Sequence, residues 1–223
     1  MDEKTLAEEV DSTLQGRIPR WPAIVALLLI TGAYWELSES LKPVSRELLG
    51  GVVVAGIVLV SLARLLERHK LVRAVALALV SAVTLAEAGS AILLVDLVPR
   101  SGYIPAPTLL RDGALIWGIN IVTFALWYWE IDAGGPVARR LSPYDSKDFL
   151  FPQQARGEAQ GGGPTPWSPD FIDYLFLAFN HSTAFSPTDT GILSRKAKVL
   201  VMIQSSISLM AVAVIIAKAI NAL

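Results

Sequence analysis

The chain has 223 residues, of which 53% are hydrophobic and 17% charged, whereas soluble domains average about 45–50% apolar and 25% charged residues. Its formal net charge of −1 offers no basic surplus for a polyanion, so nucleic acid is not an expected partner. There is no cysteine, which excludes disulfides, zinc–thiolate sites and iron–sulfur clusters. We expect no cofactor, no metal site and no enzymatic activity, because no catalytic motif is present.

Long apolar runs predict an all-α, multi-pass integral membrane protein, since a crossing helix needs about 20 mostly apolar residues. The first 20 residues are polar and acidic and are expected to be retained. Residues 21–131 form a predicted four-helix transmembrane region that ends in an aromatic belt at 127–129. Its predicted spans are 21–37, 48–66, 71–98 and 114–131.

Residues 132–170 are rich in proline and glycine and predict an aqueous loop. The last region, 171–223, begins with a short apolar helix at 171–185, which covers about 22 Å and is too short to cross comfortably. The final helix, 199–222, is long enough to span. The sequence therefore predicts five full spans plus a short pore-helix-like segment, or six spans.

The segment from Phe171 to residue 200 resembles the pore helix, filter and inner-helix start of the two-transmembrane potassium-channel pore family. That family's pattern has an aromatic residue, an acid and a leucine early in the pore helix, a threonine at its end, and an acid, a small residue and a basic residue afterwards. The positions that match it are Phe171, Asp173, Leu175, Thr183, Asp189, Ser194, Ala197 and Lys198.

The potassium filter itself is not retained. Its five positions hold Ala184, Phe185, Ser186, Pro187 and Thr188, so both glycines that aim the carbonyl rings inward are missing. The resemblance therefore implies weak or no potassium selectivity, and Phe185 is the expected constriction.

A second resemblance is to an uncharacterised bacterial polytopic membrane protein family with a TAFSPTDT motif. The motif occupies residues 183–190, preceded by DFLFPQ at 148–153 and by Gly-Gly-Pro at 134–136. This likeness implies a multi-pass protein of the bacterial inner membrane and no established activity.

Charge and length disagree about topology. If 171–185 crosses, an N-terminus inside places twelve Lys and Arg residues inside and seven outside, as the positive-inside rule requires. If 171–185 is re-entrant and is entered from outside, as in the potassium-channel family, five basic residues lie inside and fourteen outside. Both alternatives remain open from the sequence.

Several polar side chains fall within predicted spans. Glu87 marks either an ion or proton path or a hydrogen-bonded glutamate that packs against Asn120. His181 is either a pH gate or a satisfied buried histidine, and Asp189 either a pore-mouth acid or a helix cap. The other candidates, which would line an aqueous path or bond between helices, are Asn180, Gln204, Ser205 and Ser208.

These observations predict an ion-channel-like membrane protein that passes monovalent ions with little selectivity. It would assemble in the lipid bilayer as a homo-oligomer, with residues 183–189 (Thr183 to Asp189) at its axis and the last helix lining the path. The alternative is a non-conducting scaffold or accessory subunit whose pore-like segment is a packing hairpin.

Overall fold

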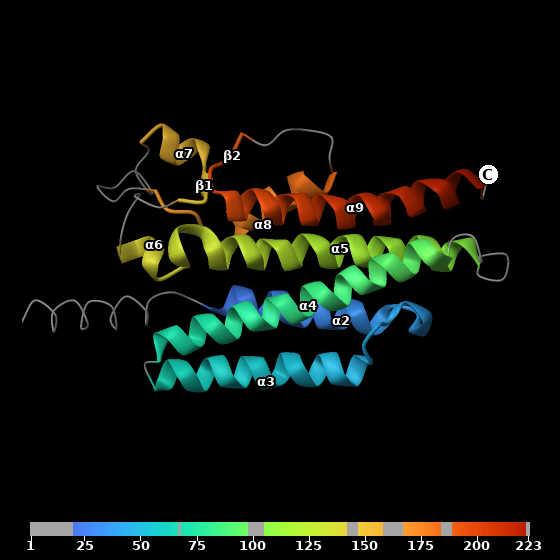
Figure 1. Cartoon of the computed structure of the whole chain (residues 1–223), viewed down its shortest axis with the longest axis horizontal. Helices are drawn as coiled ribbons and strands as arrows, with labels where there is room; N and C mark the ends of the chain where they lie inside the picture. The colour runs from blue at the N-terminus through green and yellow to red at the C-terminus, as the bar shows by residue number, and fades with distance from the viewer. Residues whose placement is uncertain are drawn as a thin grey trace, which may run out of the picture.

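The computed structural model describes residues 20–66, 68–97, 105–141, 147–157, 167–183 and 189–221. These residues form a helix bundle with a small two-stranded sheet at one end (Figure 1). Its longer helices are α2 (Trp21–Glu36), α3 (Arg46–Leu65), α4 (His69–Leu97), α5 (Ala106–Ile131), α8 (Phe171–Thr183) and α9 (Arg195–Asn221). Its short elements are η1 (Glu39–Leu41), η3 (Asp132–Gly134), α6 (Ala138–Leu141), β1 (Phe149–Leu150), α7 (Pro152–Ala155) and β2 (Gly191–Ile192).

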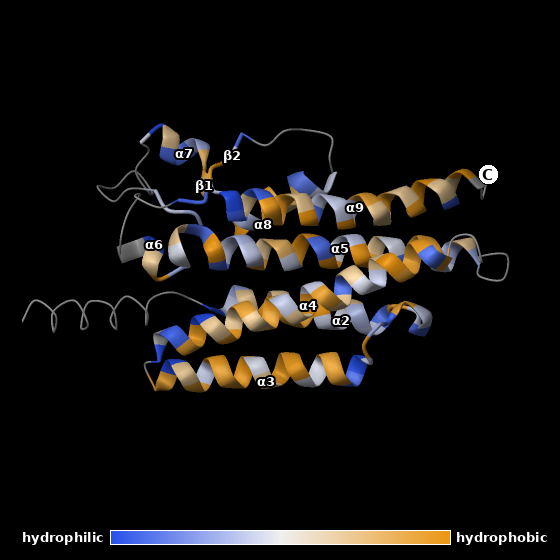
Figure 2. Cartoon of the chain, in the orientation of Figure 1, coloured by the Kyte–Doolittle hydropathy of each residue, from blue (hydrophilic) through white to orange (hydrophobic). Residues whose placement is uncertain are grey.

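The predicted all-α fold class is confirmed, and four helices support the prediction of transmembrane helices. Helices α3, α4, α5 and α9 are long and apolar enough to cross a bilayer, and hydrophobic residues run along most of their length (Figure 2). Helix α2 is apolar but has 16 residues, which cover about 24 Å. The predicted first span is therefore shorter than a regular crossing helix.

Helix α5 is the centre of the bundle and packs against α2, α4, α8 and α9, as Figure 1 shows. It begins eight residues before the predicted start of that span. The predicted span, 114–131, leaves Arg111 and Asp112 outside. In the structure Asp112 is buried and accepts hydrogen bonds from Ser38 at 2.5 Å and Arg111 at 2.9 Å, so the helix tolerates this charge.

The two ends of the bundle differ in charge. An ion pair between Arg20 and Glu130 joins the start of α2 to the end of α5, and the start of α9 lies at the same end, where Lys196 contacts Asp148 at 2.9 Å. We call this the basic end, because it holds twelve of the 16 Lys and Arg residues that the structure describes. The twelve are Arg20, Arg64, Arg68, Lys70, Arg73, Arg139, Arg140, Lys147, Arg156, Arg195, Lys196 and Lys198, while Lys42, Arg46, Arg111 and Lys218 lie toward the opposite end.

Helix α8 enters the bundle from the basic end, and the chain after it lies at that end again. Near its start, Tyr174 donates a hydrogen bond of 2.5 Å to Asp132 at the end of α5. After it, β2 pairs antiparallel with β1, which precedes α8 in the chain. The segment from α8 to β2 therefore begins and ends at the basic end, and we call it the hairpin (Figure 1). Residues 184–188, between α8 and β2, lie outside the described residues.

A tight turn follows α5 and fixes where the hairpin attaches. Gly134 and Gly135 have φ values of 84° and 102°, in the left-handed region that glycine adopts without strain. A Cβ on Gly135 would lie 3.2 Å from the carbonyl oxygen of Glu130. The Gly-Gly-Pro motif is thus explained by the reversal of the chain at this point.

Asp132 connects the end of α5 to both β1 and α8. One carboxylate oxygen accepts hydrogen bonds from the backbone N–H groups of Asp148 at 2.8 Å and Phe149 at 3.3 Å, and the other accepts from Tyr174. Burial lowers the pKa of Lys147, and the nearby carboxylate of Asp132 acts in the opposite direction and raises it. The side chain is buried, so these hydrogen bonds replace water.

We expect Asp132→Ala to lower the free energy of unfolding by about 2 to 4 kcal/mol, because it leaves two buried N–H groups and a buried hydroxyl without an acceptor. The measurement is chemical unfolding in detergent micelles. Asp189→Ala is the control, since Asp189 is an exposed carboxylate and its loss should change stability by less than about 0.5 kcal/mol. Equal effects of the two substitutions would contradict the anchoring role.

Candidate functional site

Gln204 is the centre of a buried polar network that joins α5, α8 and α9. The residue lies on α9 and is fully buried. Its amide nitrogen donates to the carbonyl of Ala178 at 2.7 Å and to the hydroxyl of Ser182 at 2.8 Å, both on α8. Its amide oxygen accepts a hydrogen bond from the Tyr128 hydroxyl on α5. Both ends of the amide are therefore used inside the protein.

Asn120 completes the network from the middle of α5. Its side-chain oxygen accepts from the hydroxyls of Ser182 at 3.2 Å and Ser208 at 3.1 Å, and its nitrogen donates to the carbonyl of Gln204 at 3.4 Å. All four residues are buried. In a hydrocarbon environment such bonds take the place of water and hold neighbouring helices together.

The last turn of α8 explains several polar residues around it. The final carbonyls of a helix have no partner within the helix, and at membrane depth water does not supply one. Here Trp117 on α5 donates to the carbonyl of Ser182 at 3.3 Å, and Ser205 on α9 donates to that of His181 at 3.3 Å. Thr183 donates to the carbonyl of Asn180 at 3.0 Å. Side chains from three helices therefore satisfy the end of α8.

The remaining sequence candidates lie at the surface of this network or outside it. The His181 ring contacts Tyr128, with 6.1 Å between ring centroids, and its Nδ1 lies 2.9 Å from the carbonyl of Leu177. Asn180 is half-buried, and Asp189 is exposed beside β2. The predicted filter-like residues Ala184, Phe185, Ser186, Pro187 and Thr188 lie outside the described residues.

Glu87 differs from the other buried polar residues. It lies on α4, is 1% exposed and faces Asn120 and Thr123 on α5. Its carboxyl oxygens and the hydroxyl of Thr123 form no hydrogen bond of regular geometry, although Asn120 and Thr123 lie close enough to interact with the carboxyl group as hydrogen-bonding neighbours. A buried carboxyl group therefore lies in the middle of the bundle with only neutral polar neighbours, Asn120 and Thr123, and no cation is among those neighbours to compensate a charge on it.

A third residue with a polar atom that forms no regular hydrogen bond, Glu130, lies nearer the basic end. Glu130 is 2% exposed and pairs with Arg20 through one carboxylate oxygen, while the other has no hydrogen-bond partner. A small cavity of about 60 Å³ beside it is also lined by Arg64, Ser61 and residues of α4. This volume has room for water, which needs at least about 10–15 Å³ of such space.

Sequence reasoning missed Thr123, Tyr128, Glu130 and Ser182. A signal for two of them was present, because Asn120, Thr123 and Glu130 are spaced by three and seven residues and so share one face of a helix. Tyr128 was predicted to belong to an interfacial aromatic belt. It is instead fully buried, and its hydroxyl is bonded to Gln204, which the sequence does not indicate.

Neither a metal centre nor a relative identifies the site. No group of three or more His, Asp or Glu side chains in the described residues is placed to hold a metal ion. No family model, curated protein or solved structure matches the chain. The function is therefore argued from the residues themselves.

We expect Gln204→Leu to lower the free energy of unfolding by about 2 to 3 kcal/mol, because Tyr128 and the carbonyl of Ala178 would lose buried partners. Ser206→Ala is the matched control on α9, since Ser206 is exposed and bonds only its own helix, at Met202. Thermal unfolding in detergent measures both. A shift for Ser206→Ala as large as that for Gln204→Leu would contradict the network's role in stability.

Proposed function

We propose that this chain is an ion-channel-like integral membrane protein that passes protons along the seam between α4 and α5. The observation that carries the proposal is the set of unsatisfied buried atoms on Glu130, Thr123 and Glu87. A carboxyl group in mid-membrane costs several kcal/mol and by default marks an ion or proton pathway. The neighbours that face it, Asn120 and Thr123, are neutral, so neither forms an ion pair that would explain a carboxyl group at this place.

The three residues follow one another along the seam. Glu130 and Thr123 are seven residues apart on α5, which is two turns or about 10 Å. Glu87 faces Thr123 from α4. Between the two levels, Trp127 donates a hydrogen bond of 2.8 Å to Thr84, so the seam carries polar groups at each step. This spacing supports a route from the basic end to the middle of the bundle.

Charge at the entrance favours a proton over other ions. Arg64 lines the cavity beside the Arg20–Glu130 ion pair, and its guanidinium group repels a metal cation there. An anion that passed Arg64 would meet the carboxyl groups of Glu130 and Glu87. A proton needs only hydrogen-bonding groups and water, which is why we infer protons among the monovalent ions that the sequence suggested.

We propose that the path runs within each protomer and not along an oligomer axis. The polar residues Gln204 and Ser208 of α9 turn inward to α5 and α8. The exposed face of α9 is apolar and suits lipid or a second copy of the chain; it carries Val199, Met202, Ile203, Leu209, Ile216 and Ile220. An oligomer is compatible with this surface but is not needed for the route.

We also propose that the basic end faces the cytoplasm of a bacterial inner membrane, with five passes through the bilayer. The excess of Lys and Arg at that end is the signal that sets orientation in bacterial membrane proteins. The hairpin of α8 would then be entered from the cytoplasm, the reverse of the potassium-channel pore. With this arrangement α8 is re-entrant and most Lys and Arg residues still lie inside, whereas entry from outside would place most of them outside.

A second candidate function is a non-conducting scaffold or accessory subunit. It is favoured by the network of Asn120, Gln204, Ser182 and Ser208, whose side chains are bonded to partners within the chain. On this alternative the hairpin is a packing element and the unsatisfied carboxyl of Glu87 serves no transport.

The orientation is tested with single cysteines, because the chain has none of its own. Ala155→Cys is exposed at the basic end, and Glu47→Cys is exposed at the opposite end. We expect a membrane-impermeant maleimide to label Glu47→Cys in intact spheroplasts and Ala155→Cys only after permeabilisation. The reverse pattern would place the basic end outside and contradict the proposal.

Proton passage is tested in liposomes that contain a pH-sensitive dye, with a potassium diffusion potential as the driving force. We expect Glu87→Gln to reduce the proton flux at least about tenfold, equivalent to about 1.4 kcal/mol, because the amide does not bind and release a proton. Glu47→Gln is the control, since Glu47 is exposed at the end of the bundle, and should retain the flux. A flux that Glu87→Gln leaves unchanged refutes the route, and a wild-type protein without flux supports the scaffold.

A further inference from the structure

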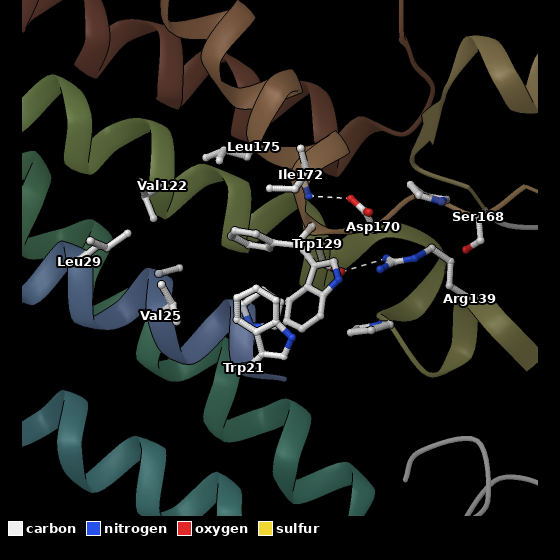
Figure 3. A pocket seen from close by; sticks show the side chains of 15 residues that line it. Trp21, Val25, Leu29, Val122, Trp129, Arg139, Ser168, Asp170, Ile172 and Leu175 are labelled. Carbon is white, nitrogen blue, oxygen red and sulfur yellow. Dashed lines mark hydrogen bonds between the residues drawn. The ribbon is translucent and has the colours of Figure 1, made fainter. Parts of the chain in front are cut away.

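A large apolar groove lies between α2 and α8 at the basic end, separate from the polar seam. Both helices pack on α5, and the strip of α5 between them forms the floor of the groove. Figure 3 shows Val25 and Leu29 on one wall, Ile172 and Leu175 on the other, and Trp129 below the mouth. The volume is about 370 Å³, within the range of small-molecule binding sites of about 300–1,000 Å³.

The groove opens outward on the bundle and not into its core. Leu29 is 60% exposed and Ile172 is 64% exposed, so the walls face what surrounds the protein. Trp21 lines the groove at the start of α2, and Leu29 lies eight residues deeper, about 12 Å along the helix. In a bilayer an unfilled apolar channel of this kind forfeits dispersion contacts, which a hydrocarbon chain would supply.

Polar groups are confined to the mouth of the groove. Arg139 lines it and is held in place by hydrogen bonds to the carbonyls of Trp129 at 2.9 Å and Asp132 at 3.0 Å. Asp170 also lines the mouth, but its carboxylate caps α8 by accepting from the N–H groups of Ile172 and Asp173. The mouth lies at the end that holds most of the described Lys and Arg residues. Such basic sites between membrane helices attract anionic headgroups.

We propose that this groove binds one acyl chain of an anionic phospholipid from the leaflet at the basic end, with its phosphate beside Arg139 and Ser168. The apolar walls fit the chain, and the guanidinium group of Arg139, at the end that holds most of the described Lys and Arg residues, fits the phosphate, while the carboxylate of Asp170 is engaged by the start of α8. Tryptophans near the mouth, Trp21 and Trp129, suit the boundary between headgroups and hydrocarbon. The inference goes beyond proton passage and does not depend on it.

The test is native mass spectrometry of the full chain, delipidated in detergent and then titrated with phosphatidylglycerol or phosphatidylcholine. We expect one tightly bound phosphatidylglycerol and about fivefold weaker binding of phosphatidylcholine, since a Lys or Arg near the membrane surface contributes about 1 kcal/mol with anionic lipid. Equal binding of the two lipids would overturn the assigned headgroup. Inorganic phosphate should not displace the lipid, because it lacks the chain.

Two tryptophan substitutions on α2 form a matched pair. Leu29 lines the groove and Leu28 does not, although they are adjacent and are 60% and 55% exposed. We expect Leu29→Trp to fill the groove and weaken phosphatidylglycerol binding at least about tenfold, or about 1.4 kcal/mol, while Leu28→Trp binds like the wild type. If Leu29→Trp is not monodisperse, Ile172→Trp fills the same groove from α8.

Equal lipid binding by the groove variants and by Leu28→Trp would overturn the proposal. A wild-type chain that binds no phospholipid would also overturn it. If that chain is a dimer in detergent, the groove becomes a candidate contact between two copies.

Discussion

The end of α8 inside the bundle is the constraint on which much of the structure depends. A helix that stops at membrane depth leaves carbonyl groups that water does not reach, and these require donors from the protein. Trp117 and Ser205 supply such donors from α5 and α9. Gln204 then joins α8 to α5 through Ser182 and Tyr128. The polar residues that α9 directs toward α8, Gln204 and Ser205, follow from this requirement.

The hydrogen-bonded network around Gln204 provides a comparison for Glu87 and Thr123, which are also buried polar residues inside the bundle. Asn120 lies between the two groups, because its amide bonds Ser182 and Ser208 on one side while Glu87 faces it on the other. The polar residues of the network form hydrogen bonds of regular geometry with one another, whereas Glu87 and Thr123, although they face each other, form none. A stabilising role accounts for the first group and not for the second, and this difference is the physical basis for the proposed proton route.

The sequence predicts the helices better than it predicts their contacts. Run length places the boundaries of α3, α4 and α8 within two residues of those observed, because a charge or proline ends each apolar run. The early start of α5 was missed, since only the fold shows that Ser38 and Arg111 compensate Asp112. The hydrogen-bond partners of Tyr128 and Glu130 were not predicted from the sequence either, because they lie far away in the chain. The filter-like residues 184–188 remain a sequence prediction.

The conflict between charge and helix length came from one assumption, the side from which the hairpin enters. The short length of α8 favoured re-entry, and the potassium-channel resemblance implied entry from outside, which would put most Lys and Arg residues outside, against the positive-inside rule. Entry from the basic end agrees with both the helix length and the positive-inside rule. The two halves of the bundle then differ: toward the basic end, Glu130 and Thr123 retain unsatisfied atoms, whereas toward the opposite end Ser90 donates to its own helix at Ala86 and Asp112 is paired. On the proposed route, the barrier to proton passage therefore lies between Glu87 and the opposite end, where the bundle offers no free hydrogen-bonding atom among the buried side chains that the structure describes.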